Sequence, residues 1–122
     1  MSETINHEMK MTYVIVPEVE YLNREAGEMV YAGKHENALG LFARALTLDP
    51  SSADTWYNRG NCLDELGRHG DAVECYNRTI KIDPCHAEAW YNKGMSLKKL
   101  GKTEEAERCV DQAVRLAQGL EE

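Results

Sequence analysis

The sequence lacks the long apolar runs and basic clusters that mark several common classes of protein. Its longest apolar run, Tyr13–Val16, is far shorter than the roughly 20 residues that a transmembrane helix needs. Lys and Arg number 14 against 21 Asp and Glu, a net charge of −7, so neither a nucleic acid nor an anionic membrane is expected as the main partner. No basic stretch followed by an apolar one opens the chain, so we expect no signal peptide and a cytoplasmic location.

The cysteines and histidines are not spaced for metal binding or catalysis. Cys62, Cys75, Cys85 and Cys109 form no CxxC pair, and without a secretory signal they are expected to be reduced thiols. The histidines lack ligand spacing, and no Gly-rich phosphate loop occurs. Cys85 and His86 are adjacent, but neighbouring side chains in a turn usually diverge. We therefore expect no metal, no other cofactor and no enzymatic activity.

Two stretches of the chain repeat nearly the same residues at a spacing of 34. Residues 53–60 read ADTWYNRG and residues 87–94 read AEAWYNKG, and a gapless alignment of 53–86 on 87–120 pairs ten identical residues. A further shift by 34 places small residues and a proline in register again, namely Ala26, Gly33, Ala38 and Pro50 on Gly60, Gly67, Ala72 and Pro84. The 122 residues are therefore three copies of one unit within a single domain.

Within each copy the apolar residues recur at helical spacing. Trp56, Gly60 and Leu63 follow one another at steps of four and three. A glycine and a basic residue stand where the first helix of each copy should end, and Asp-Pro steps end the second helices of the first two copies. These signals predict helices near 18–32, 35–48, 53–66, 69–82, 87–100 and 103–118, with Pro17 in the first turn of the first helix.

The pattern of tryptophan, small residue, leucine, glycine, alanine, aromatic residue and proline resembles the tetratricopeptide repeat over about residues 19–120. The resemblance implies an all-α fold: an α-solenoid of three tandem helix-turn-helix repeats, whose six main helices form a right-handed superhelix with a concave groove. The expected organisation is an N-terminal arm (1–17), a repeat domain (18–120, with repeats 19–52, 53–86 and 87–120) and a C-terminal tail (121–122).

Two sets of residues within the repeats have expected packing roles. Gly60 and Gly94 are expected to permit close helix crossing. Arg59 and Lys93 stand where the family usually has an apolar residue, and their stems are expected to lie along a neighbouring helix with the charges in water.

The resemblance also implies a non-catalytic protein-interaction module or scaffold, which binds a peptide segment or partner helix in the groove. The first helix of each repeat lines the groove, and the candidate contact residues are Asn23, Arg24, Tyr57, Asn58, Asn61, Glu65, Tyr91, Asn92, Met95, Lys98 and Lys99. In relatives that hold extended peptides, a ladder of asparagines contacts the peptide backbone, because each amide offers a donor and an acceptor. Asn58 and Asn92 would form two rungs, with Arg24 at that place in the first copy; the alternative is that these positions serve packing.

One ligand of the family is not expected here. Related repeats clamp the acidic C-terminal tail of heat-shock chaperones with basic and asparagine side chains. Only Asn58 matches those positions, and Glu88 stands where a lysine is needed, so a dicarboxylate would be repelled. A ligand with an acidic end toward the third copy, which holds Lys98 and Lys99, and a basic end toward Asp64 and Glu65 would match the charges.

A second function, of a different class, also fits the sequence. The last predicted helix carries Val110, Val114 and Leu116, with Leu120 following it, and an open apolar face there would favour self-association. The Tyr13–Val16 run could cover the first helix pair, lie in the groove of a neighbouring molecule or pair with its twin. A homodimer through the apolar end faces and the N-terminal arm is therefore the alternative to peptide binding.

Overall fold

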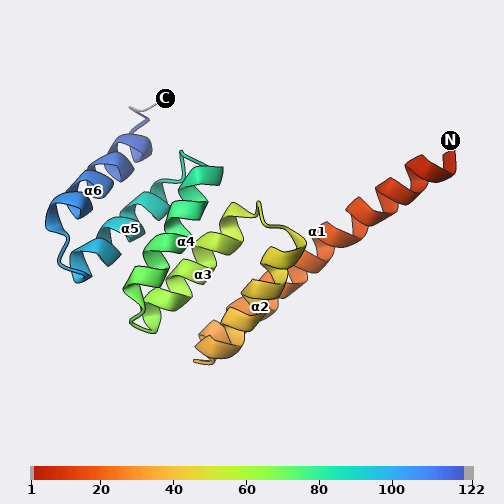
Figure 1. Cartoon of the computed structure of the whole chain (residues 1–122), viewed down its shortest axis with the longest axis horizontal. Coiled ribbons are helices and arrows are strands. Elements are labelled where there is room, and N and C mark those ends of the chain that lie inside the picture. Colours follow the sequence, from red (N-terminus) through yellow and green to blue (C-terminus); the bar gives the residue numbers. More distant parts are fainter. Residues whose placement is uncertain (1, 120–122) are drawn as a thin grey trace. The chain divides into compact units, whose positions relative to one another are not determined.

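The computed structural model describes the backbone of residues 2–119 and the side chains of residues 17–119. Every regular element in this range is an α-helix, which confirms the all-α prediction. The helices, labelled in Figure 1, are α1 (Ser2–Tyr31), α2 (His35–Leu48), α3 (Ala53–Glu65), α4 (His69–Ile82), α5 (Ala87–Lys99) and α6 (Thr103–Ala117). The bounds of α2 to α6 agree with the predicted ones to within one residue.

The predicted start of the first helix is wrong. α1 begins at Ser2, and Pro17 lies inside it instead of in its first turn. A proline inside a helix removes one backbone hydrogen bond and crowds the preceding turn, but the Met, Glu and Lys residues before it favour a helix. Residues 2–17 are therefore part of α1. The roles considered for Tyr13–Val16 concern side chains that lie outside the described residues.

The turns inside the three helix pairs share one backbone geometry. Gly33, Gly67 and Gly101 have φ angles of +78°, +78° and +82°, a region that side chains disfavour. In each turn the following N–H bonds to a carbonyl five residues earlier, as Arg68 N does to Leu63 O at 2.8 Å. This is the Schellman arrangement, and it confirms the glycine stops predicted from the sequence.

The turns that follow α2 and α4 are also alike. The side-chain oxygens of Asp49 and Asp83 accept hydrogen bonds from the N–H two residues later, at 3.1 and 3.2 Å. Ser52 Oγ then accepts a hydrogen bond from the first turn of α3, and His86 Nδ1 accepts one from the first turn of α5. These N-caps satisfy N–H groups that have no partner within the helix.

The contacts between helices divide the chain into two compact units, residues 1–51 and 52–122. In the first unit α1 packs against α2, where Val19, Leu22 and Ala45 are buried together. In the second unit α3, α4, α5 and α6 lie side by side in chain order (Figure 1), each packed on the next. Each unit buries its own apolar helix faces.

Two glycines inside helices of the second unit mark close helix contacts. A Cβ atom at Gly60 would lie 2.6 Å from Cε1 of Tyr76, and one at Gly94 would lie 2.8 Å from Cγ2 of Val110. Both distances are far below ordinary van der Waals contact. The prediction that Gly60 and Gly94 serve helix packing is therefore confirmed.

Arg59 and Lys93 lie along tryptophan rings. The guanidinium carbon of Arg59 is 5.8 Å from the ring centre of Trp56, and Nζ of Lys93 is 5.5 Å from that of Trp90. Both residues are half-buried, and each ring belongs to the same helix as its basic residue. Arg59 Nε is buried without a hydrogen-bond partner, so the prediction that the charge of Arg59 lies in water is wrong. Arg59 Nη1 also donates to Cys75 Sγ at 3.3 Å, although burial still raises the pKa of that thiol.

Candidate functional site

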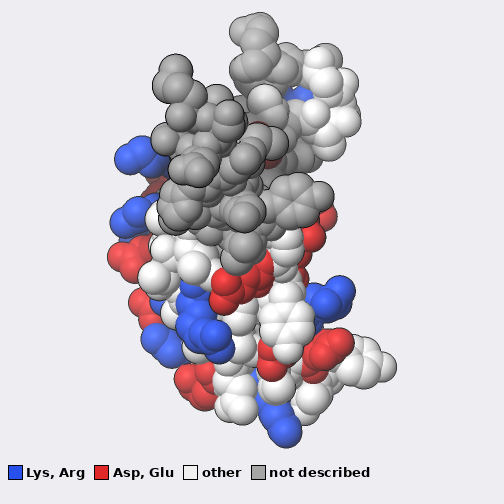
Figure 2. Space-filling view, turned by 90° about the vertical axis from the view of Figure 1, so that its right-hand side faces the viewer, with Lys and Arg blue, Asp and Glu red and all other residues white. Residues whose placement is uncertain are grey.

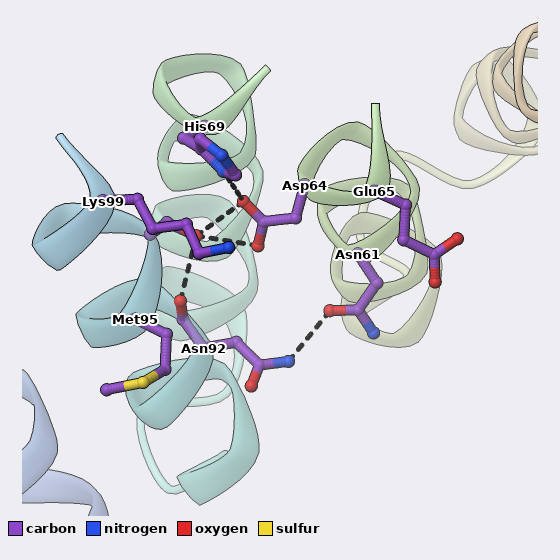
Figure 3. Close-up of a pocket in the computed structure, with 8 residues that line it drawn as sticks. Asn61, Asp64, Glu65, His69, Asn92, Met95 and Lys99 are labelled. Atoms are coloured by element: carbon purple, nitrogen blue, oxygen red, sulfur yellow. Dashed lines mark hydrogen bonds and ion pairs between the residues drawn. The ribbon is translucent and has the colours of Figure 1, made fainter. Parts of the chain in front are cut away.

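Three helices of the second unit surround an open cavity of about 570 Å³. Its lining comes mostly from α3 and α5, at positions three or four apart that share one helix face. The lining residues are Asn61, Asp64, Glu65, His69, Asn92, Met95, Ser96 and Lys99, drawn in Figure 3. Most of the lining residues therefore carry polar groups, with acidic, basic and amide side chains within one face.

Asp64 is the centre of a hydrogen-bond network beside this cavity. Its carboxylate accepts from Tyr76 OH and Ser96 Oγ, both at 2.7 Å, and lies 2.8 Å from His69 Nδ1. Because a carboxylate only accepts, His69 Nδ1 carries the proton. Tyr76 is fully buried; burial, and then its hydrogen bond to Asp64, raise its pKa well above the ordinary value. The hydroxyl therefore remains a donor, and the network ties α3 to α4 and α5.

Two asparagines join α3 to α5 at the cavity. Asn92 Nδ2 donates to Asn61 Oδ1 at 2.9 Å and to Tyr57 OH at 3.0 Å. Asn61 Oδ1 also lies 2.7 Å from Tyr76 OH, whose single proton is shared between Asn61 and Asp64. These bonds fix the orientation of both amides. The amide atoms that they do not use, Asn61 Nδ2 and Asn92 Oδ1, point to the same side of the pair in Figure 3.

The Asn61–Asn92 pair thus presents one donor and one acceptor side by side. A residue in an extended segment has the complementary pair, because its C=O accepts, its N–H donates, and both point to the same side of the segment. Exchanging oxygen and nitrogen in both amides reverses their order but still leaves one donor and one acceptor. The pair can therefore hold the backbone of one extended residue whatever its side chain.

A second cavity, of about 410 Å³, adjoins the first at Asn92, which lines both. It is mainly apolar, and its lining residues are Tyr57, Ala87, Glu88, Tyr91, Asn92, Ala113, Val114 and Ala117. Tyr91 and Val114 are each 47% exposed. The Tyr57 ring lies 4.8 Å from His86 and 6.0 Å from Tyr76, centre to centre, which holds it in the cavity wall. One face of the second unit therefore has a polar and an apolar compartment next to each other.

Ser96, His69 and Asp64 are the residue types of a catalytic triad, but they are not connected as one. A nucleophilic serine must donate its proton to the histidine, whereas Ser96 donates to Asp64. Cys85 is an exposed thiol beside His86. The Nδ1 atom of His86 already accepts the hydrogen bond that caps α5. The arrangement is suited to holding a ligand by hydrogen bonds and not to activating a nucleophile.

Seven of the predicted groove residues line one or both of these cavities: Tyr57, Asn61, Glu65, Tyr91, Asn92, Met95 and Lys99. Lys98 lines a separate cavity formed by α5 and α6. Asn58 is half-buried and lines neither of the two, so the geometry pairs Asn92 with Asn61 and not with Asn58. Asn23 and Arg24 belong to α1 in the other unit.

Three residues of the network were not among the predicted contacts: His69, Tyr76 and Ser96. Asp64 was expected only to face the basic end of a ligand. A comparison of equivalent positions in the three copies would have identified most of these residues. The second copy has Asn61, Asp64, His69 and Tyr76 where the first has Gly27, Val30, His35 and Phe42 and the third has Met95, Lys98, Thr103 and Val110. The polar partners occur together only in the second copy, so the repeat pattern alone does not require them.

Three further observations concern the described residues as a whole and not the two cavities. On the described part of the face in Figure 2, Lys and Arg side chains are interspersed with Asp and Glu side chains. Among the described residues, no group of three His, Cys, Asp or Glu side chains is placed to hold a metal ion. No helix in this part of the chain is long and apolar enough to cross a membrane.

Solved structures with the same arrangement of helices come from several proteins. A crystal structure of MamA superposes with a TM-score of 0.81 at 24% identity, covering 84% of this chain and 60% of that one. The second TPR of Spaghetti (RPAP3), bound to the HSP90 peptide SRMEEVD, gives 0.79 at 20% identity, with 81% and 92% covered. The Sgt2 TPR domain from Aspergillus fumigatus gives 0.80 at 20% identity, with 84% and 68% covered.

The chain spans less than two-thirds of the MamA structure. The comparison with curated proteins finds no match, whereas the comparison with protein families does. Two family models described as tetratricopeptide repeat match residues 53–84 and 75–108. Together with the period of 34 and the all-α repeat structure, these matches show that the chain belongs to the tetratricopeptide repeat family.

Proposed function

We propose that the chain is a non-catalytic protein-interaction module that binds an extended peptide on the face formed by α3 and α5. The observation that carries this proposal is the Asn61–Asn92 pair, whose remaining donor and acceptor match the backbone C=O and N–H of one extended residue. The same fold binds a peptide in the RPAP3 structure, which supports a peptide as the class of ligand.

An extended segment fits this pair better than a helix does. In a helix the backbone N–H and C=O groups bond to one another, so they are not available to a partner. In an extended segment both groups of a residue are free, and main-chain hydrogen bonds give affinity while pockets select side chains. The pair therefore favours a peptide strand over a partner helix.

The surrounding network lowers the cost of binding. Tyr57 and Tyr76 already hold the two amides in place, so few side-chain rotations are lost when a peptide arrives. Such preorganisation increases affinity by reducing the entropy that binding removes. The buried network beside Asp64 thus acts as support for the contact surface.

The test begins with a display library of random 12-residue peptides selected on the immobilised protein. Selected peptides are then titrated by fluorescence anisotropy against Asn61→Ala, Asn92→Ala and Asn58→Ala. We expect the first two variants to weaken binding about five- to tenfold, as the loss of one or two hydrogen bonds predicts. Asn58→Ala is expected to change little, because Asn58 lines neither cavity.

Asn77→Ala is the matched control, because Asn77 is an exposed asparagine of α4 that lines a different cavity. Circular dichroism should confirm that all variants keep their helices. Equal affinity of the selected peptides for the original protein and for both Asn61→Ala and Asn92→Ala would contradict the proposal. A loss only in Asn58→Ala and Asn92→Ala would instead support the two-rung ladder.

A further inference from the structure

We propose that this face selects peptide segments in which a large apolar side chain lies next to a basic one. The inference rests on the proposed function and names the class of ligand. It combines the apolar cavity beside Asn92 with the excess of carboxylates around both cavities.

The apolar cavity has a fixed place relative to the peptide contact. Asn92 lines both cavities and donates its bonds toward α3, so an extended residue held by the Asn61–Asn92 pair lies at the edge of the apolar cavity. The cavity volume of about 410 Å³ is large enough for a leucine, methionine or phenylalanine side chain. The bound residue or its direct neighbour therefore supplies this side chain.

The charges around the two cavities favour a basic neighbour. Three carboxylates (Asp64, Glu65 and Glu88) against one ammonium (Lys99) leave two net negative charges in the combined lining. Glu65 and Glu88 are exposed, and the whole chain carries −7. Complementary charge raises the rate of encounter and disfavours wrong partners, so acidic segments are repelled and basic ones are attracted.

Side-chain geometry sets the spacing between the two residues. Successive side chains of an extended segment point to opposite faces, so residues two apart share a face. With the apolar side chain in the cavity at Val114, a basic side chain one or two residues away reaches the cavity rims. A second copy of this chain is a poorer occupant, because it would bring the same carboxylates toward one another.

The test compares peptide selections from a random 12-residue display library on the protein and three variants. The original protein is expected to enrich Lys or Arg within two residues of Leu, Met or Phe. Glu65→Lys combined with Glu88→Lys should abolish the enrichment of basic residues, and Val114→Asp should abolish that of apolar ones. Glu107→Lys reverses one charge at an exposed position that lines neither cavity, and it should leave both enrichments unchanged.

Anisotropy titrations of one enriched peptide give the second measurement. We expect the double charge reversal to weaken binding by about fivefold or more at low salt, with a smaller effect at high salt because salt screens exposed charges. An unchanged affinity would overturn the assignment of the basic residue.

Three further outcomes separate this inference from the proposed function. If the binding of selected peptides depends on Asn61 and Asn92 but the peptides show no apolar or basic preference, the inference is wrong and the proposed function stands. Recovery of no peptide that depends on the pair would overturn both. If Val114→Asp changes a dimer into a monomer in light scattering and leaves the selection unchanged, the apolar cavity is a self-association surface and the inference is wrong.

Discussion

The missing side chain of Gly60 lets Tyr76 come close to α3, where its hydroxyl reaches both Asn61 and Asp64. Gly60→Ala would place a Cβ atom 2.6 Å from the Tyr76 ring. The gain in helix propensity, about 1 kcal/mol, is smaller than the cost of overpacking a buried ring, about 1–3 kcal/mol. We expect a net loss of up to about 2 kcal/mol in the free energy of unfolding, measured by urea denaturation.

Gly40→Ala is the contrasting substitution. Gly40 lies inside α2, is exposed, and has no atom within 4 Å of the position that a Cβ would take. Alanine should therefore stabilise the protein by about 0.5–1 kcal/mol, through helix propensity alone. If Gly60→Ala also stabilises, Tyr76 can move aside and the network around it is not rigid.

Among the helices, the parts predicted well from the sequence are those with local causes. α2 to α6 end at a glycine, an Asp-Pro step or a change of repeat, and each of these signals lies within a few residues of the boundary. The start of α1 was predicted poorly, because Pro17 can stand equally in a first turn or inside a helix at some cost. The repeat pattern fixes the fold because it occurs in three copies.

The site was only partly predictable for the same reason. Helical spacing places Asn61 and Asn92 on the groove-lining faces of α3 and α5, and both were among the expected contacts. Their pairing depends on Tyr57 and Tyr76, which come from α3 and α4. Such contacts follow from the packing of three helices and not from the spacing within one. A sequence pattern can therefore name the face, whereas the bonds across it require the structure.

The link that Tyr76 makes between α3 and α4 gives a prediction about pH. Burial raises the pKa of Tyr76 in the folded protein, whereas an unfolded tyrosine ionises near pH 10. Above about pH 10 the unfolded state therefore loses a proton that the folded state keeps, and stability falls. Burial of Cys75 and Cys109 acts in the same direction from about pH 9, because it raises the pKa of each thiol.

Tyr76→Phe isolates the contribution of the tyrosine. Phenylalanine stands at the equivalent position of the first copy, as Phe42, so the ring position tolerates it. At about pH 7 we expect Tyr76→Phe to lower the free energy of unfolding by about 1–2 kcal/mol, because Asp64 and Asn61 lose a donor. The deficit should shrink as the pH rises past about 10. A deficit that stays constant in urea denaturation up to about pH 11 would show that Tyr76 ionises equally in both states.

At the scale of the whole molecule, net charge bears on which peptides this chain can bind. The chain carries −7, and its two adjoining cavities have more carboxylates than ammonium groups. The similar RPAP3 structure holds an acidic peptide, SRMEEVD. Under the proposed function we expect a different ligand for this chain, because proteins that share a helix arrangement can present different charges.

The acidic peptide itself provides the last test. We expect SRMEEVD to bind this chain at least about tenfold more weakly than SRMKKVD, in which lysines replace both glutamates, since each exchange converts repulsion into attraction. Fluorescence anisotropy at low salt measures both affinities, and Glu88→Lys should narrow the difference, because it removes one carboxylate from the face. Glu107→Lys, at a position that lines neither of these two cavities, should not. Tight, saturable binding of SRMEEVD would mean that basic groups elsewhere on the chain hold its carboxylates, and that the charges around the two cavities do not decide which peptide is bound.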